Sequence, residues 1–288
     1  MLTTAVMVGT AHSFDLFGSL EAPASPVILS VPHAGRDYPL ALRAALRVPT
    51  EALTVLEDRH VDQLASAARD AETMLVQRPA RAWIDLNRDE SERDPRVDDG
   101  VDPRAAQAPS AKLRSGLGLV PRRIGRHGDL WQRPFAGEAI AARIAADHRP
   151  YHRALAAALA AARARFGAAV LIDVHSMPPL ADTAMVFGDR YGRAAATRFV
   201  HRLEAEAEAA GLRYALNAPY AGGHILDRHG DPARGIHAVQ IEWSRALYLD
   251  AALDQPGPGL AGAARIFRRM IDAIADEAAS GALSLAAE

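Results

Sequence analysis

The sequence contains no cysteine. Disulfide bonds, thiolate metal sites and cysteine nucleophiles are therefore excluded, and any metal ion must be held by histidine, aspartate or glutamate. Lysine is almost missing as well, since Lys112 is the only one in the chain. Together with the excess of alanine, this one-sided use of arginine indicates a GC-rich genome rather than a function.

The chain also lacks a strong charge of either sign, with a formal net charge of -2 and an isoelectric point of about 6.6. No general positive field is available to attract nucleic acid or an acidic membrane surface, so neither is an expected partner. The first basic residue is Arg36, so the charged start of a secretory signal is missing. No apolar run approaches the roughly 20 residues that span a bilayer. We expect a cytoplasmic protein, whose oligomeric state the sequence does not indicate.

What the chain does have is length and apolar content, 288 residues of which 49% are hydrophobic. We expect one domain over residues 1–288, because an α/β domain of this size can bury one core. Apolar runs alternate with helical patterns, which predicts an α/β/α sandwich with a mixed, largely parallel sheet. The expected strands are residues 26–32, 73–77, 81–86, 168–174, 184–187, 212–216 and 236–243. The expected helices are residues 50–70, 135–166, 192–211 and 261–279.

The segment 88–134 interrupts this alternation. It is highly charged, is broken by Pro95, Pro103, Pro109 and Pro121, and ends at Pro134. Loops of this length inside a compact domain are usually functional or mobile. Two interpretations remain open: a lid over the site, or a surface insertion with a short helix near residues 105–114.

Two histidines directly follow apolar strands, His33 in VILSVPHAG and His175 in VLIDVHSMPP. Ligands in open α/β sheets bind at the carboxyl ends of strands, so the pair predicts a metal site, although a lone histidine is more often structural. Asp173 lies two residues before His175, on the same strand face. It can orient the imidazole, unless it only hydrogen-bonds to backbone.

A catalytic zinc ion takes three protein ligands and keeps one position open, so a carboxylate is the natural third partner. The segment LEDRHVDQL offers two candidates. One unbroken helix from Thr50 places Glu57 on the apolar face and turns Asp58 sideways. A helix that restarts with Asp58 as its N-cap leaves Asp58 free to reach a metal ion. Periodicity does not decide between them.

Further charged groups follow the run RAWIDLNRDE. Asn87 and Arg88 form a pair suited to holding a substrate carboxylate, because arginine presents a bidentate fork. A salt bridge of Arg88 with a neighbouring glutamate competes with this role. Arg81 shares a face with Asp85, so an internal ion pair competes with any catalytic role of Arg81.

Glu242 interrupts the apolar strand in HAVQIEWSRALYLD. Burial raises the pKa of a carboxyl group toward the range of a general base, whereas pairing with Arg245 gives it a structural role. The preceding loop, NAPYAGGHILDRHGDP, contains His224 and His229. We interpret it as a flexible wall of the same cleft or as a plain surface loop.

With these residues in hand, the sequence resembles the N-formylglutamate amidohydrolase family and, more distantly, the zinc carboxypeptidases and aspartoacylase. The matching segments lie in the family's order between about residues 31 and 250: VPHAGRDYP, EDRHVDQL, ARAWIDLNR, LIDVHSMP, NAPYAGG and QIEWSRALYLD. The resemblance implies a zinc-carboxypeptidase-like fold and a cytoplasmic amidohydrolase of histidine degradation that acts on linear amides. Its substrate would be a small N-acyl amino acid with a carboxylate.

The resemblance also assigns roles, one by one. It implies that His33, Asp58 and His175 bind one Zn²⁺ or another divalent ion, which favours Asp58 over Glu57. It makes Glu242 the base and Asn87 with Arg88 the substrate-binding pair. Zinc would activate a water for attack on the formyl carbonyl, and Arg81 would stabilise the oxyanion. The family's wider relatives carry a His-x-x-Glu motif, whereas Ala34, Gly35 and Arg36 follow His33 here.

Other functions remain as alternatives. A related deacylase or carboxypeptidase would use the same reacting groups with a different pocket. A non-catalytic binding protein would keep the fold and the pocket. A ureohydrolase with two manganese ions requires Asp-x-His-x-Asp, and DVHSM has Met177 in the last position.

Overall fold

The computed structural model of the protein describes residues 13–102 and 110–285, and a seven-stranded sheet in the order β1-β3-β2-β6-β9-β7-β8 forms its centre. Neighbouring strands β3, β2, β6 and β9 are parallel, whereas β1 and β7 run antiparallel to their inner neighbours and β8 runs parallel to β7. This mixed, largely parallel sheet confirms the predicted fold class. The strands are β1 (Phe14–Phe17), β2 (Val27–Val31), β3 (Thr73–Gln77), β6 (Ala169–Met177), β7 (Met185–Gly188), β8 (Tyr214–Leu216) and β9 (Ile236–Ser244).

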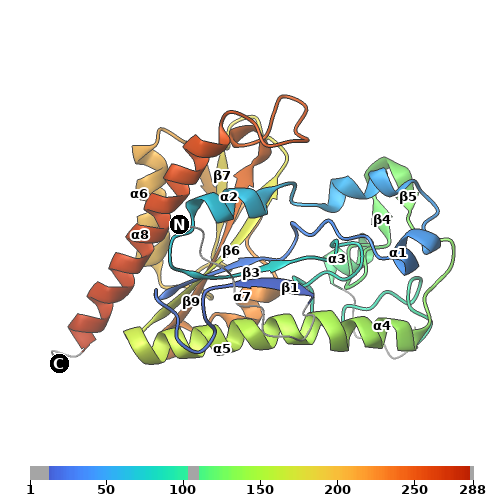
Figure 1. Ribbon diagram of the computed structural model, residues 1–288, viewed down its shortest axis with the longest axis horizontal. Coiled ribbons are helices and arrows are strands. Elements are labelled where there is room, and N and C mark those ends of the chain that lie inside the picture. The colour runs from blue at the N-terminus through green and yellow to red at the C-terminus, as the bar shows by residue number, and fades with distance from the viewer. Residues whose placement is uncertain (1–12, 103–109, 286–288) are drawn as a thin grey trace, which may run out of the picture.

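Helices cover both faces of the sheet (Figure 1). On one face lie α2 (Val61–Ala68), α6 (Thr197–Ala209) and α8 (Leu260–Leu285), and on the other lie α5 (Arg149–Phe166) and α7 (His224–His229). The central strands are buried on both sides, which is why they read as continuous apolar runs in the sequence. No helix of the described residues combines the length and the apolar character needed to cross a membrane.

A long continuous helical segment, called the rod below, runs beneath the sheet. It consists of α4 (Gly137–Arg143), a π-helical turn (Ile144–His148) and α5 in direct succession, which matches the helix predicted over residues 135–166. Helix α6 lies within the predicted range 192–211, and α8 contains the predicted range 261–279 and extends beyond both of its ends. The rod extends past the edge of the sheet and supports the segment that follows β3.

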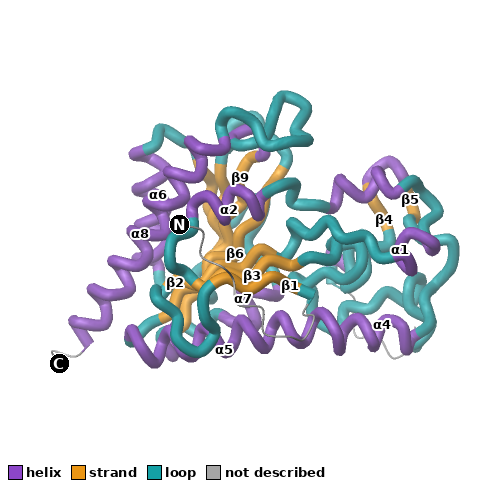
Figure 2. The backbone as a smooth tube through the Cα atoms, in the orientation of Figure 1, coloured by secondary structure: helices purple, strands orange, loops and turns teal. Residues whose placement is uncertain are grey.

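That segment forms the part of the molecule on the right of Figure 2, where loops predominate over helices and strands. It contains α3 (Ala111–Arg114) and the two-stranded sheet of β4 (Arg123–Ile124) and β5 (Gly128–Asp129), and it lies near α1 (Leu40–Ala45). The short helix expected near residues 105–114 is present from Ala111, and residues 105–109 of that prediction lie outside the described part.

Two predictions about secondary structure were wrong. Residues 81–86 form turns rather than a strand, because the amide of Asp85 donates to the carbonyl of Leu119 and not to a neighbouring strand. The side chains of Ala82, Ile84 and Leu86 are nevertheless buried, which produces the apolar signal. The predicted helix 50–70 is broken into a 3-10 helix (Thr50–Leu56) and α2, and the chain between them is not helical.

Candidate active site

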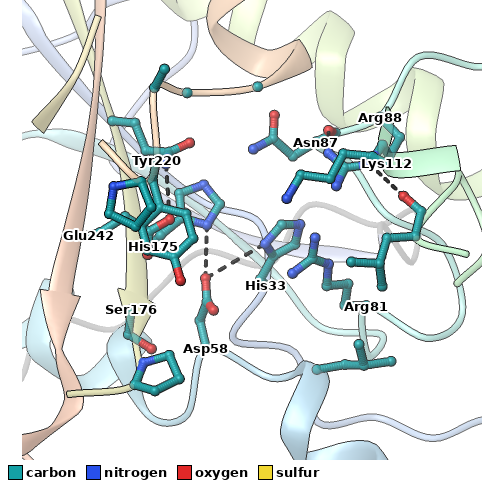
Figure 3. Close-up of a pocket in the computed structure, with 18 of the residues that line it drawn as sticks. His33, Asp58, Arg81, Asn87, Arg88, Lys112, His175, Ser176, Tyr220 and Glu242 are labelled. Carbon is teal, nitrogen blue, oxygen red and sulfur yellow. Dashed lines mark hydrogen bonds and ion pairs between the residues drawn. The ribbon is translucent and has the colours of Figure 1, made fainter. Parts of the chain in front are cut away.

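The three predicted ligands meet at the carboxyl end of the central strands (Figure 3). His33 follows β2, His175 lies near the end of β6, and Asp58 lies in the break between the 3-10 helix and α2. Asp58 Oδ2 is 2.8 Å from His175 Nδ1 and 3.6 Å from His33 Nδ1. The amide of Asp58 also donates to the carbonyl of His33 at 2.9 Å, which fixes the break beside the strand.

The far nitrogen of each imidazole is held by a second carboxylate. His175 Nε2 lies 2.8 Å from Asp173 Oδ2, as the strand period predicted, and His33 Nε2 lies 2.7 Å from Asp85 Oδ1. Histidines that bind metal ions typically have the other ring nitrogen bonded in this way, because the bond fixes the tautomer and the ring orientation. His33 Nδ1 is buried and has no hydrogen-bond partner, so its lone pair is available to a ligand in the site.

Electrostatics favour an ionised carboxylate between these imidazoles. Burial alone would raise the pKa of Asp58, but the hydrogen bonds and charges of His175 and His33 outweigh it and lower the pKa. Burial lowers the pKa of His175, whereas Asp173 and Asp58 raise it well above its ordinary value. Ligand atoms of His33, Asp58 and His175 all lie within 4.8 Å of one another. Two imidazoles and one carboxylate form a donor set that fits a zinc ion.

Glu242 lies on β9 directly beside His175, its register partner on β6. Gln240 Nε2 donates to Glu242 Oε1 at 2.9 Å. Burial raises the pKa of Glu242 to about 7, and the charge of Asp58 adds to this, although the charges of His175 and Arg81 oppose it. The carboxyl group can therefore accept and return a proton near neutral pH, as a general base must.

The two alternatives for the third ligand are now separated by geometry. Glu57 turns away from the imidazoles and accepts hydrogen bonds from Tyr38 and Arg59. Asp58 faces both imidazoles, although the N-cap of α2 is His60 and not Asp58. Of the two alternatives, the restarted helix is the one present, although Asp58 is not its N-cap, and the break frees Asp58.

Arg81 lines the same cavity and forms the internal ion pair that its spacing suggested. Its Nε lies 2.9 Å from Asp85 Oδ2, while the other oxygen of Asp85 holds His33. One buried carboxylate thus fixes both a proposed metal ligand and the arginine beside it. The positive charge of Arg81 is the main influence that lowers the pKa of Asp85 against its burial.

Asn87 and Arg88 lie on the wall opposite Asp58, together with Lys112 (Figure 3). Arg88 donates through Nε to the carbonyl of Leu117 and through Nη1 to that of Asn87, at 2.7 and 2.6 Å. Asn87 Oδ1 accepts from the amide of Ile225 at 2.9 Å. These bonds hold both side chains in place and leave Asn87 Nδ2 and Arg88 Nη2 for a ligand. Glu92 approaches Arg88 only to 3.9 Å.

A model of the N-formylglutamate amidohydrolase family matches residues 25–249, a range that contains all seven predicted site residues. The chain belongs to the N-formylglutamate amidohydrolase family. It is 32% identical over 236 residues to the N-formylglutamate deformylase of Pseudomonas putida and 30% identical to that of Pseudomonas aeruginosa; each alignment covers 78% of this chain and 82% of the relative. The crystal structure of N-formylglutamate amidohydrolase from Ralstonia eutropha matches with 32% identity and a TM-score of 0.83, covering 93% of this chain and 99% of that one.

Several residues of this N-formylglutamate amidohydrolase family site escaped the sequence interpretation. Asp85 was seen only as the partner of Arg81, and Lys112 only as a compositional oddity. Lys112 lies on α3 and lines the cavity, so its singularity in an arginine-rich chain was the available signal. Arg245 lies 3.9 Å from Asp58 Oδ1 and 3.2 Å from Ser176 Oγ rather than pairing with Glu242. The cavity enclosed by these residues has a volume of about 390 Å³.

The loop before β9 has two different halves. Residues 219–223 line the cavity, as the interpretation of a cleft wall required. The rest is helical, since His224–His229 forms α7, and neither His224 nor His229 is among the residues that line the cavity. Both rings instead pack against His152 on α5, with ring centroids 5.3 and 5.2 Å from it.

A chain of hydrogen bonds connects the site to the helix layer beneath the sheet. Tyr151 on α5 shares a hydrogen bond of 2.9 Å with Ser30 Oγ, which donates to Asp173 Oδ1 at 2.8 Å. Asp173 in turn binds His175 through its other oxygen. All four side chains are buried, so the orientation of His175 depends on a residue in α5.

Proposed function

We propose that the protein hydrolyses the amide bond of an N-acyl amino acid, most specifically N-formyl-L-glutamate to formate and L-glutamate, and that it needs a divalent metal ion, zinc by preference. The observation that carries the proposal is the convergence of His33, Asp58 and His175 beside Glu242, in a cavity whose far wall is cationic. The relatives whose names state this activity support the choice of substrate.

The metal ion would be held by His33 Nδ1, His175 Nδ1 and Asp58. When bound, it would supply Lewis acidity that brings the pKa of a water molecule near neutrality and polarises the amide carbonyl. The protein's part is to keep both imidazoles in one tautomer. Asp85 and Asp173 accept hydrogen bonds from the outer Nε2 atoms, which leaves the inner Nδ1 lone pairs for the metal.

Glu242 handles the proton. With a pKa of about 7 it is partly ionised at neutral pH, so it can take a proton from the attacking water and return it to the leaving amine. Gln240 holds one carboxylate oxygen, which leaves the other for the water. Arg81 is the proposed donor to the oxyanion, because its ion pair with Asp85 fixes the guanidinium group at the cavity wall.

The cationic wall accounts for an acidic substrate. Asn87 and Arg88 would hold one carboxylate of glutamate through the nitrogens that their own hydrogen bonds leave free. Lys112 lies close enough to Arg88 and Arg81 that, after burial, their positive charges are the main influences lowering its pKa. A second carboxylate beside Lys112 would relieve this repulsion, and glutamate carries two.

The test is a panel of N-formyl, N-acetyl and N-succinyl amino acids, assayed with metal-loaded and chelator-treated protein. We expect N-formyl-L-glutamate to be the best substrate, with activity that disappears on chelation and returns with zinc. Preference for another acyl group would replace the substrate and keep the mechanism. Hydrolysis that is indifferent to chelator would contradict the metal requirement, and bound metal without any turnover would identify a binding protein.

A matched variant tests the role of Glu242. Glu242→Gln should bind zinc normally and lose about 10²–10⁴-fold in kcat, the usual contribution of a general base. Gln240→Ala serves as the control, because it removes a neighbouring side chain and leaves the Glu242 carboxylate in place. We expect a smaller loss of kcat in this variant. Full activity of a zinc-bound Glu242→Gln protein would remove the base assignment.

A further inference from the structure

A second group of histidines lies behind the substrate-binding wall. His148 ends the π-helical turn, His152 follows one turn later on α5, and His224 and His229 stand at the two ends of α7. His148 and His152 are completely buried and His229 nearly so, while His224 is partly exposed. A ring nitrogen from each of His148, His152 and His224 lies within 4.8 Å of the other two.

The backbone fixes the tautomers of two of these rings. His148 Nε2 lies 2.8 Å from the carbonyl oxygen of Arg88, and His152 Nε2 lies 3.0 Å from that of Leu86. Because a carbonyl oxygen only accepts hydrogen bonds, both Nε2 atoms carry the hydrogen. In the neutral rings the Nδ1 atoms then hold the lone pairs. On His224 the two nitrogens are exchanged: Nδ1 lies 3.7 Å from Asp89 Oδ2, too far for a hydrogen bond but close enough to feel its charge, and Nε2 is the buried nitrogen.

The inward nitrogens are poorly satisfied. His148 Nδ1 and His224 Nε2 are buried and have no hydrogen-bond partner. A carboxylate oxygen of Glu90 lies 3.6 Å from His148 Nδ1, so two acceptors face each other. A buried polar atom without a partner costs about 1–3 kcal/mol, which a cation between the nitrogens would recover. His152 Nδ1 accepts from His229 Nε2 at 2.9 Å, and metal binding would replace that single bond.

We propose that His148, His152 and His224 form a second metal site, specific for a divalent transition ion of the zinc type, whose role is structural. Imidazole ligands favour zinc, copper or nickel over magnesium or calcium. None of the three lines the cavity of about 390 Å³, so the site is separate from the proposed substrate cavity, as the sites of structural ions are.

The location of the site indicates what a bound ion would do for the substrate-binding pair. The carbonyls that anchor His148 and His152 belong to Arg88 and Leu86, the two neighbours of Asn87. Gly223, which precedes His224, packs so closely on Asn87 that an added Cβ would lie 2.5 Å from its Oδ1. An ion held by α5 and α7 would therefore fix the Asn87–Arg88 pair from behind. This positioning role rests on the proposed function, whereas the metal site itself does not.

The experiment counts ions. The full chain is stripped with chelator, reloaded with zinc, desalted and measured by elemental mass spectrometry. We expect two ions per chain in the wild type, one in His148→Gln and one in Asp58→Asn. His237→Asn, a buried histidine outside both groups, should keep two ions. A wild type with one ion, lost in Asp58→Asn and kept in His148→Gln, would overturn the proposal.

A gentler variant covers the case in which His148→Gln fails to fold. Asp89 has a side chain that is 51% exposed, so Asp89→Asn should fold normally. Loss of a carboxylate beside a metal-binding histidine typically weakens metal binding about 10–100-fold. We expect this at one of the two zinc sites, measured by competition with a chromophoric chelator. If the zinc affinity of each site is the same in Asp89→Asn as in the wild type, His224 is not a ligand.

The positioning role has its own readout. His148→Gln, with the first site loaded, should raise KM for N-formyl-L-glutamate several-fold while kcat changes little, because the displaced pair binds substrate and does not touch the scissile bond. A fall in kcat alone would contradict positioning. If no substrate is hydrolysed at all, the ion count still decides on the second site.

Discussion

The two histidine groups of this protein are built from the same side chain and behave in opposite ways. At the His33–His175 group, three carboxylates surround two imidazoles, and burial is outweighed so that the pKa of His175 rises. At the His148–His152–His224 group, burial dominates and lowers the pKa of all three rings. The His33–His175 group, called the open group below, opens into the cavity beside Glu242, the proposed general base. The His148–His152–His224 group, called the closed group, does not line that cavity. The difference separates a site proposed for chemistry from one proposed for rigidity.

The largest expected effect breaks the open group. Asp58→Asn removes the carboxylate that lies between the two imidazoles, and loss of the several kcal/mol that a metal ion contributes would lower kcat/KM by at least about 10³-fold. Glu57→Gln changes the adjacent carboxylate, which faces Tyr38 and Arg59, and should keep activity within about threefold. Steady-state kinetics of the two zinc-loaded proteins makes the comparison. Equal losses would show that the helix break, rather than the ligand, was disturbed.

The next largest effect is expected at Arg88, which contacts both the cavity and the closed group. Arg88 points its guanidinium group toward the cavity and its carbonyl toward His148. Arg88→Ala would remove the proposed charged hydrogen bond to the substrate, worth about 1.5–3 kcal/mol, so KM should rise about 10–100-fold while the zinc content stays constant. Arg149→Ala, at an exposed neighbouring arginine, should change KM less than twofold. A loss of zinc in Arg88→Ala would mean that the side chain also supports the metal.

A histidine outside both groups provides a reference for acid stability. Burial and the nearby Arg198 lower the pKa of His237 to about 4, against about 6.5 in the unfolded chain. The unfolded state therefore binds the proton first, and stability falls as pH drops from 6.5 to 4. We expect His237→Asn to reduce that fall by about 2 kcal/mol in urea titrations at the two pH values. An identical fall in the variant would contradict the lowered pKa.

The smallest effect tests the contact between the closed group and the cavity. Gly223→Ala places a Cβ against Asn87, so we expect KM to rise about tenfold, in line with the loss of one neutral hydrogen bond. Gly262→Ala on α8 meets only the end of the Arg265 side chain at 3.9 Å and should leave KM unchanged. Parallel kinetics on both variants distinguishes a specific clash from a general effect of alanine. An unchanged KM in Gly223→Ala would show that Asn87 does not need its present position.

The sequence predicted the open group better than the closed one for a physical reason. Parallel strands buried on both faces are continuous apolar runs, so β2 and β6 and the histidines at their ends were visible. Residues 81–86 gave the same apolar signal without pairing, because burial on alternate residues does not require a neighbouring strand. The break before α2 was also ambiguous, since it depends on the hydrogen bond from Asp58 to His33 across 25 residues of chain.

The closed group was not predicted, because His224 was noted only as part of a cleft wall and its two partners come from a segment that looks featureless. His148 and His152 lie in an alanine-rich helix, where helix propensity explains the composition, and their four-residue spacing was the only local signal. Their hydrogen-bond acceptors are backbone carbonyls, which no side-chain pattern reveals. Lys112 was hidden in the same way by a helix of four residues in a long loop.

Consecutive residues of α5 serve the two groups. Tyr151 reaches His175 through Ser30 and Asp173, and His152 next to it belongs to the closed group. A rigid helix cannot move one of these side chains without the other, so the two sites share a mechanical support. Thermodynamic linkage then requires reciprocity. If an ion in the closed site strengthens metal binding at the open site, an ion in the open site strengthens metal binding at the closed site by the same free energy. The order in which the two ions bind would change the rate at which the doubly loaded protein forms, and the final state would be the same.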